Sequence, residues 1–124
     1  MSSFSELITE FREDVPGFIA ADIIDIKNGM SIGGDSIDPE FDSDVASASY
    51  AEVVKANRRA LELLEMKADS TEDILITTDE VYMLIYELGP DHFLGLAIDK
   101  DASPGMARTM MQKYAPKFLE VIPS

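Results

Sequence analysis

One apolar run constrains the fold of this chain more than any other feature. Residues 93–98 read FLGLAI, with no alternation between apolar and polar positions. Continuous apolar runs of this length are typical of strands in a sheet that is covered on both faces. We therefore expect a middle strand here, with other elements packed on either side of it.

A helix is expected directly after this strand. Residues 99–101 end the apolar run, and Ser103 followed by Pro104 fits the N-cap and first position of a helix. The segment 92–111 carries no nucleophile with a base, no cluster of metal ligands and no phosphate-binding loop. Its information is architectural, so function has to be sought on the surfaces of the fold.

Charge and composition exclude several classes of partner. The chain has 124 residues, of which 24 are acidic and 10 basic, and its net charge of −14 repels nucleic acids and anionic membranes. Hydrophobic residues make up 46% of it, which is ordinary for a globular protein, and residues 1–124 are expected to form a single domain. The absence of cysteine excludes disulfides and thiol chemistry.

We expect no signal for export and no membrane-spanning segment. The first residues, MSSFSELITEF, are acidic where a secretory signal would be basic, and no run approaches the ~20 apolar residues of a membrane span. We expect a soluble, cytoplasmic protein.

The remaining pattern predicts two further helices and four further strands. Residues 3–14 show helical spacing behind a capping box of Ser3 and Glu6, and residues 43–67 form a long amphipathic helix. Strands are expected at 18–26, 30–32, 71–78 and 81–88. Gly33 and Gly34 are expected to end the second of these strands. Because short loops cannot make parallel crossovers, the order predicts an α+β fold with a five-stranded antiparallel sheet.

No group of residues indicates catalysis or metal binding. The acidic segment 35–44 lacks the D-x-D-x-D-G core and the terminal glutamate of a calcium loop, so we expect it to be solvated. His92 has no second base or nucleophile tied to it, and Asp22 and Asp25 are lone carboxylates on a strand, expected to be solvated or hydrogen-bonded. We expect no enzyme, no catalytic residues, no metal and no cofactor.

The long helix has two features that bear on partners. Its apolar stripe comprises Ala46, Ser49, Tyr50, Val53, Asn57, Ala60, Leu61 and Leu64. The amide of Asn57 needs a hydrogen-bond partner, either nearby backbone in the core or another helix across a symmetric interface. Lys55, Arg58 and Arg59 form a basic cluster on the opposite face, either a solvated surface or a docking patch for an acidic partner.

Three passages of the chain together match the pattern of one known family. They are VPGFIAADIIDIKNGMSIGG, the long helix, and DILITTDEVYMLIYELGPDHFLGLAIDKDASPGMAR, so the match runs from about residue 15 to 119. The turn and helix start after the last strand match it at Asp99, Lys100, Ser103, Gly105 and Arg108. In this pattern and order of elements, the chain resembles the roadblock family of dynein light chains and bacterial GTPase-regulating, MglB-like domains.

The resemblance implies a fold and a dimer. The fold would be roadblock/longin/profilin-like, with strand order 2-1-5-4-3 and helices on both faces of the sheet, which places residues 93–98 in the middle. Two copies would pair through their third strands and long helices. Independently, residues 74–76 form an apolar edge without lysine, proline or a bulge, and such edges normally find a partner strand. The expected dimer interface comprises Tyr50, Val53, Asn57, Leu61, Ile74 and Ile76.

The resemblance also implies a non-enzymatic function. Some roadblock proteins bind and regulate small Ras-like GTPases, and others are subunits of dynein or signalling complexes. On this analogy the chain would bind a small GTPase through its long-helix face, with Lys55, Arg58 and Arg59 as contact residues. Two alternatives stay open, because fold analogy alone does not fix function. One is a pure scaffold subunit of a motor or signalling complex, and the other is a small-molecule-sensing domain with an internal pocket.

Overall fold

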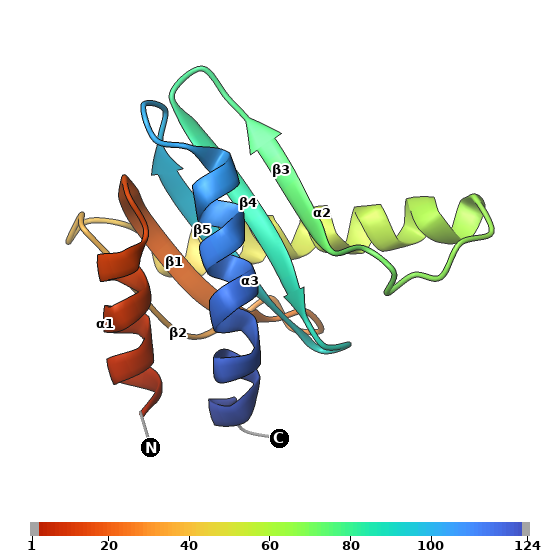
Figure 1. Ribbon diagram of the computed structural model, residues 1–124. Coiled ribbons are helices and arrows are strands. Elements are labelled where there is room, and N and C mark those ends of the chain that lie inside the picture. The colour runs from red at the N-terminus through yellow and green to blue at the C-terminus, as the bar shows by residue number, and fades with distance from the viewer. Residues whose placement is uncertain (1–2, 123–124) are drawn as a thin grey trace.

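In a computed structural model, the chain folds into a five-stranded antiparallel sheet between two layers of helix (Figure 1). The structure describes residues 3–122. Its elements are α1 (Phe4–Asp14), β1 (Phe18–Asp25), β2 (Ser31–Ser36), α2 (Ser43–Leu63), β3 (Asp73–Thr77), β4 (Val81–Leu88), β5 (His92–Asp99) and α3 (Pro104–Val121). The strand order is β2-β1-β5-β4-β3, and all neighbouring strands are antiparallel. The predicted fold class and strand order are confirmed.

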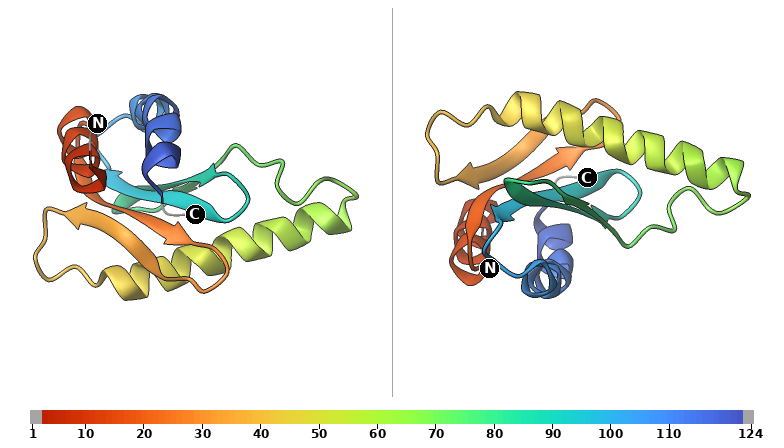
Figure 2. Two further views of the ribbon diagram at one scale, coloured as in Figure 1. Left: turned by 90° about the horizontal axis from the view of Figure 1, so that it is seen from below. Right: turned by 90° about the horizontal axis from the view of Figure 1, so that it is seen from above.

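The sheet has a core on each face. Helices α1 and α3 cover one face and α2 covers the other (Figure 2). The larger core, which includes Phe11 and Phe118, lies under α1 and α3, and the smaller core lies under α2. Strand β5 supplies Leu94 and Leu96 to the first core and Phe93 to the second, and all three side chains are fully buried. This explains why the sequence of β5 is apolar at consecutive positions.

The helices begin where the sequence places their caps. The hydroxyl of Ser3 accepts a hydrogen bond from the backbone N–H of Glu6 at 3.2 Å, and that of Ser103 accepts one from Met106 at 3.1 Å. These side chains satisfy N–H groups that a helix start otherwise leaves without a partner. None of the helices in the described part of the chain is both long and apolar enough to cross a membrane.

The long helix is shorter than the predicted range 43–67. It ends at Leu63, and Glu65 adopts a left-handed conformation with φ of 61°. The backbone N–H of Met66 then donates to the carbonyl of Leu61 at 2.8 Å. This pattern closes a helix by satisfying its last carbonyl groups, usually with glycine rather than glutamate at the left-handed position.

Strand β2 is longer than predicted. It runs from Ser31 to Ser36, straight through the two glycines that were expected to end it. Their role is close packing, because a Cβ at Gly33 would lie 2.3 Å from the ring of Phe4 and one at Gly34 would lie 2.2 Å from the carbonyl oxygen of Ala21. Glycine inside a strand commonly marks such a close approach.

Helix α2 extends beyond the sheet. Its first half lies across β1 and buries Ser47, Tyr50, Ala51 and Val54, whereas its second half projects past β3 (Figures 1 and 2). At the projecting end the side chain of Leu63 is 80% exposed. The projection leaves part of a long helix without a covering element in the protomer.

Candidate interaction surface

A second apolar stripe on α2 lies beside β3 and is only partly covered. The residues that α2 buries against the sheet include Ser47, Ala51 and Val54, which lie about one position away from the apolar stripe predicted from the sequence. Much of the predicted stripe therefore lies beside the buried face of the helix. We name the resulting surface the α2–β3 face. It comprises the half-buried residues Val53, Asn57, Leu61, Ile74 and Ile76.

The two isoleucines of β3 lie on the sheet face that α2 covers. Ile74 pairs with Ile85 of β4, and Ile76 pairs with Met83. Ile85, Ile74 and Met83 all belong to the core under α2, and alternate residues of a strand share a face. Ile76 therefore continues the apolar surface of α2 onto the edge strand.

Tyr50 has a different position from the other residues predicted for the interface. Its ring is 6% exposed and packs edge-on against Phe93, with 6.4 Å between ring centroids. A Cβ at Gly95 would lie 3.0 Å from the ring, so the glycine makes room for it. Burial raises the pKa of the Tyr50 phenol above its ordinary value. Tyr50 thus belongs to the core under α2 and contributes little to the exposed surface of the protomer.

Asn57 is satisfied by a side chain of the same protomer. Its Nδ2 donates to the hydroxyl of Thr71 at 2.7 Å. The bond ties the segment between α2 and β3 to the projecting half of the helix. Within the protomer the partner is thus a side chain and not the nearby backbone group considered from the sequence, and pairing with a second helix across a symmetric interface stays a prediction.

The basic cluster does not form one free patch. Arg58 Nε donates to Glu87 Oε1 at 3.2 Å, and Arg58 Nη1 donates to the carbonyl oxygen of Pro90 at 3.1 Å. The Arg58 side chain is 19% exposed, so it holds α2 to β4 and to the following turn. Lys55 is half-buried and Arg59 is exposed. Of the three predicted contact residues, Arg59 is the most accessible.

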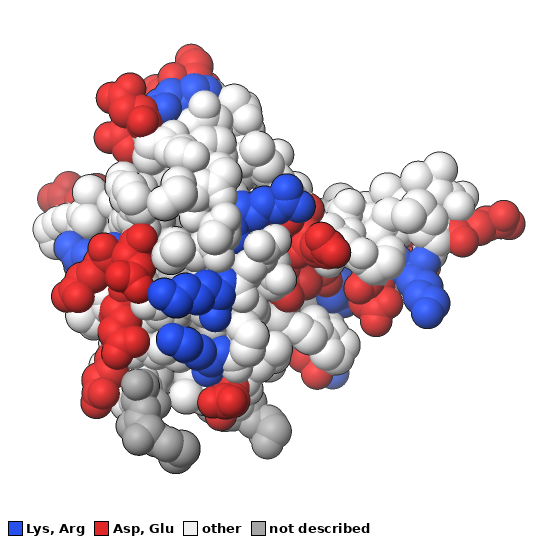
Figure 3. All heavy atoms as spheres, in the orientation of Figure 1, with Lys and Arg blue, Asp and Glu red and all other residues white. Residues whose placement is uncertain are grey.

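Apolar surface is exposed around the α2–β3 face. On the sheet side of α2 a surface hollow of about 260 Å³ is lined by Ile19, Phe41, Ala46, Ser49, Tyr50, Val81, Met83 and Ala97. Beyond the sheet, Leu64 and Met66 are 69% and 52% exposed. In Figure 3 the projecting end of α2 has an uncharged upper surface, with charged side chains at its tip and below it. Exposed apolar patches of this kind typically mark interaction sites.

The edge of β3 is open. Among residues 3–122, β3 pairs with β4 and has no strand on its other side. Leu75, between the two isoleucines, is 49% exposed. An apolar edge with free N–H and carbonyl groups readily accepts another strand.

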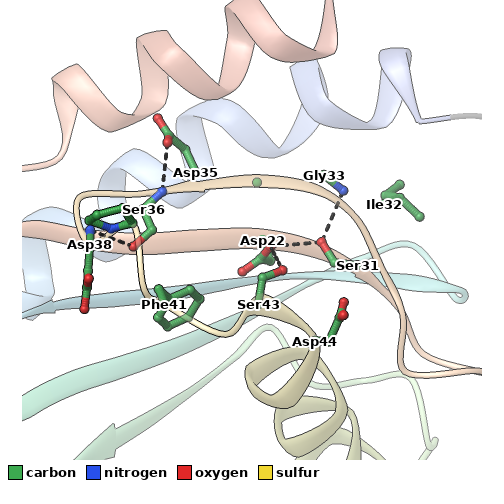
Figure 4. Close-up of a pocket in the computed structure, with 12 residues that line it drawn as sticks. Asp22, Ser31, Ile32, Gly33, Asp35, Ser36, Asp38, Phe41, Ser43 and Asp44 are labelled. Carbon is green, nitrogen blue, oxygen red and sulfur yellow. Dashed lines mark hydrogen bonds between the residues drawn. The ribbon is translucent and has the colours of Figure 1, made fainter.

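A polar pocket lies at the opposite edge of the sheet, and the sequence did not predict it. Asp22 of β1 is 4% exposed, and its Oδ1 accepts hydrogen bonds from Ser31 at 2.9 Å and from Ser43 at 3.1 Å (Figure 4). Desolvation raises the pKa of the Asp22 carboxyl. The signal in the sequence was a carboxylate that interrupts an apolar strand, but nothing local showed that Gly34 pairs opposite it.

The other polar candidates have local roles. Asp25 accepts hydrogen bonds from the backbone N–H groups of Lys27 and Asn28 and so closes the β1–β2 turn. His92 is the half-buried first residue of β5. Within residues 3–122 no group of histidine or acidic side chains is placed to hold a metal ion. Four pockets of this part are open to solvent, so none of the four is the enclosed cavity of a small-molecule sensor.

Known structures define the fold. No protein-family model and no curated protein matches the chain. Among solved structures, this chain is similar to MglB from Myxococcus xanthus, with a TM-score of 0.83 at 15% sequence identity. The match covers 97% of each chain. An MglB with tetrameric arrangement has a TM-score of 0.83 at 18% identity, over 94% of this chain and 85% of the other. A Roadblock/LC7 domain from Streptomyces avermitilis has a TM-score of 0.80 at 14% identity over 94% of each.

These similarities assign the α+β architecture to one known fold. The helices, the sheet and the strand order of the chain are those of a roadblock fold.

Proposed function

We propose that this protein is a non-enzymatic, homodimeric regulator of a small Ras-like GTPase. The observation that carries the proposal is the α2–β3 face, an apolar helix surface that continues onto an open strand edge. The roadblock fold and the resemblance of the sequence to GTPase-regulating roadblock proteins favour this function. We further propose that residues 1–124 act as one domain in the cytoplasm.

The dimer would form around a two-fold axis beside β3. Two copies of β3 would pair edge to edge, joining the two sheets. The projecting half of α2 from each protomer would then lie near its symmetry mate, because it already extends past β3. Such an isologous interface uses the same residues from both copies. Val53, Asn57, Leu61, Ile74 and Ile76 would be buried, and Tyr50 would lie in the core under α2 of each protomer.

The GTPase would bind across the paired long helices. Lys55 and Arg59 would contact acidic groups of the GTPase, since a local positive charge on a molecule of net charge −14 orients an acidic partner. Arg58 would act indirectly by holding α2 against Glu87 and Pro90.

The test is binding to purified Ras-like GTPases encoded near this protein, loaded with GDP or with a GTP analogue. We expect binding that depends on the nucleotide, and a changed rate of GTP hydrolysis on mixing. The double variant Lys55→Glu/Arg59→Glu should weaken binding at least tenfold. Lys113→Glu/Lys117→Glu is the matched control, because those lysines are exposed on α3, across the sheet from α2.

The outcomes separate the candidate functions. Binding with an unchanged hydrolysis rate would identify a scaffold rather than a regulator. If no GTPase binds in either nucleotide state, the proposed function is wrong. Equal loss of binding in both charge-reversal pairs would remove Lys55 and Arg59 as specific contacts.

A further inference from the structure

The polar pocket around Asp22 has the features of a binding site. It has a volume of about 500 Å³ and lies between β2, the loop 37–42 and the start of α2 (Figure 4). The lining includes Asp22, Ser31, Asp38, Ser43 and Asp44 and, among the described residues, no lysine, arginine or histidine. Because β2 and β3 are opposite edges of the sheet, the pocket is separate from the α2–β3 face.

The carboxylate of Asp22 is buried but only half satisfied. Both of its hydrogen bonds, from Ser31 and Ser43, go to Oδ1. Its Oδ2 accepts no hydrogen bond from residues 3–122 and points into the pocket (Figure 4). Asp22 as a residue is 4% exposed, and the charge of a largely buried carboxylate is costly unless hydrogen bonds or a cation compensate it. The free oxygen therefore faces the place where a ligand could bind.

The backbone around Asp22 is shaped to hold the carboxylate there. Gly34 lies directly opposite Asp22 in the β1–β2 ladder. A Cβ at Gly34 would lie 2.4 Å from Asp22 Oδ1 and 2.2 Å from the carbonyl oxygen of Ala21. Any side chain at position 34 would displace the carboxylate, so the glycine keeps this part of the pocket open.

The charges of the pocket select the kind of ligand. Asp38 and Asp44 are exposed at the pocket, and the charge of Asp44 contributes to the raised pKa of Asp22. Asp35 also lines the pocket, but its carboxylate bonds to Arg12 at 2.9 Å and points toward α1 (Figure 4). Three carboxylates that form no ion pair with the described residues, those of Asp22, Asp38 and Asp44, would repel phosphates and other carboxylates. Metal ions are disfavoured too, since the described residues include no group that could hold one.

We propose that this pocket binds an organic cation with N–H donors, a guanidinium or ammonium group. The cation donates a hydrogen bond to Asp22 Oδ2, and Asp38 and Asp44 balance its remaining charge. The hydroxyl groups of Ser31 and Ser43 hold the carboxylate from its other oxygen. The group belongs either to an arginine or lysine of another protein or to a free amine. The inference is independent of the proposed function.

Amide NMR titrations with three singly charged probes test the site. The probes are methylguanidinium, a capped Gly-Arg-Gly peptide and tetramethylammonium, which has the charge but no N–H donor, all at constant ionic strength. We expect saturable shifts of the amides of Gly33, Gly34 and Ser43 with the first two probes, at least tenfold tighter than with tetramethylammonium. Tighter binding of the peptide assigns the site to a protein partner, and tighter binding of methylguanidinium assigns it to a free amine.

Variants connect the binding to the pocket. Asp22→Asn keeps an oxygen that can accept from Ser31 and Ser43, so it should fold, and it should weaken binding at least tenfold. Asp44→Asn, at an exposed position, should weaken it severalfold without any effect on the core. Asp25→Asn is the control on the same strand, outside the pocket lining. Equal affinity for tetramethylammonium, or unchanged binding in both Asp22→Asn and Asp44→Asn, would overturn the proposal.

Discussion

Arg58 of α2 and Glu87 of β4 form an ion pair that holds the long helix against the sheet. The two side chains are 19% and 6% exposed, so the pair is largely removed from water. Arg58 also donates to the carbonyl oxygen of Pro90 at 3.1 Å, while Glu87 Oε2 is buried without a hydrogen bond from the described residues. Glu87 therefore depends on Arg58 for the compensation of its charge.

Replacement of Arg58 by alanine should lower the free energy of unfolding by about 3 kcal/mol, because it leaves the buried carboxylate of Glu87 without a partner. Urea denaturation followed by circular dichroism measures the change. Arg59→Ala, one residue on and exposed, should change the stability by no more than about 0.5 kcal/mol. The double variant Arg58→Met/Glu87→Met should recover most of the loss. Equal effects of Arg58→Ala and Arg59→Ala would show that the pair contributes nothing.

Substitution of Gly34 by alanine should destabilise the protein by about 2–3 kcal/mol, the range of an overpacked site. The new methyl group would meet the backbone carbonyl of Ala21 at 2.2 Å, and backbone atoms cannot move aside as a flexible side chain can. Thermal unfolding measures the loss. Gly105→Ala is the matched control, because the nearest atom to a Cβ there is Ser103 Oγ at 3.6 Å. If both alanine variants are equally stable, Gly34 does not pack against β1 as described.

Local signals predicted the middle of the fold well. The apolar run of β5 needs no information beyond its own residues, and the caps Ser3 and Ser103 act on backbone groups three residues away. The periodicity of α2 predicted an amphipathic helix but placed its buried face one residue off. The helix has small or apolar side chains on two adjacent faces, and the sheet beneath it decides which one is buried.

Contacts between distant segments could not be predicted in the same way. In the sequence, Gly33 and Gly34 resembled the end of a strand. In the structure they lie inside β2, at positions where Phe4 and Ala21 leave no room for a Cβ. Arg58 resembled a surface residue, because its partner Glu87 lies 29 positions further along the chain. The resemblance to roadblock proteins supplied the strand order, but it said nothing of the pocket around Asp22.

The stability of the protein should depend on the ionisation of Asp22. Burial raises the pKa of this carboxyl in the folded state above its value in the unfolded chain, so between the two values the folded state binds more protons. The free energy of unfolding therefore falls as pH rises through the folded pKa, and the cost of the buried charge is fully present above it.

Asp22→Asn should consequently be more stable than the natural protein at pH 7, and the gain should shrink as the pH is lowered toward 4. Urea denaturation of both proteins at several pH values measures the difference. Asp25→Asn should show no such gain, because Asp25 is only half-buried and lies at the turn that follows β1. A gain for Asp22→Asn that stays constant across this range would contradict the role given to burial.

Charges placed on the α2–β3 face should convert the dimer into folded monomers. We select Leu61→Lys on the projecting half of α2 and Ile76→Lys on the edge strand, since both side chains are half-buried in one protomer. A buried charge without a partner is strongly unfavourable, so the combined variant should weaken dimerisation at least a hundredfold. Light scattering during gel filtration, over a range of protein concentrations, measures the mass.

The matched control places a charge at the opposite edge of the same sheet. Ile32 of β2 is 40% exposed, so Ile32→Lys places a charge on an apolar residue of the other edge strand without touching β3. It should leave the mass of the dimer unchanged. Circular dichroism should show native helix content in both variants, because α2 keeps its buried residues Tyr50 and Val54. A monomer mass for the natural protein at micromolar concentration would refute the dimer, and dissociation by Ile32→Lys alone would place the interface at β2.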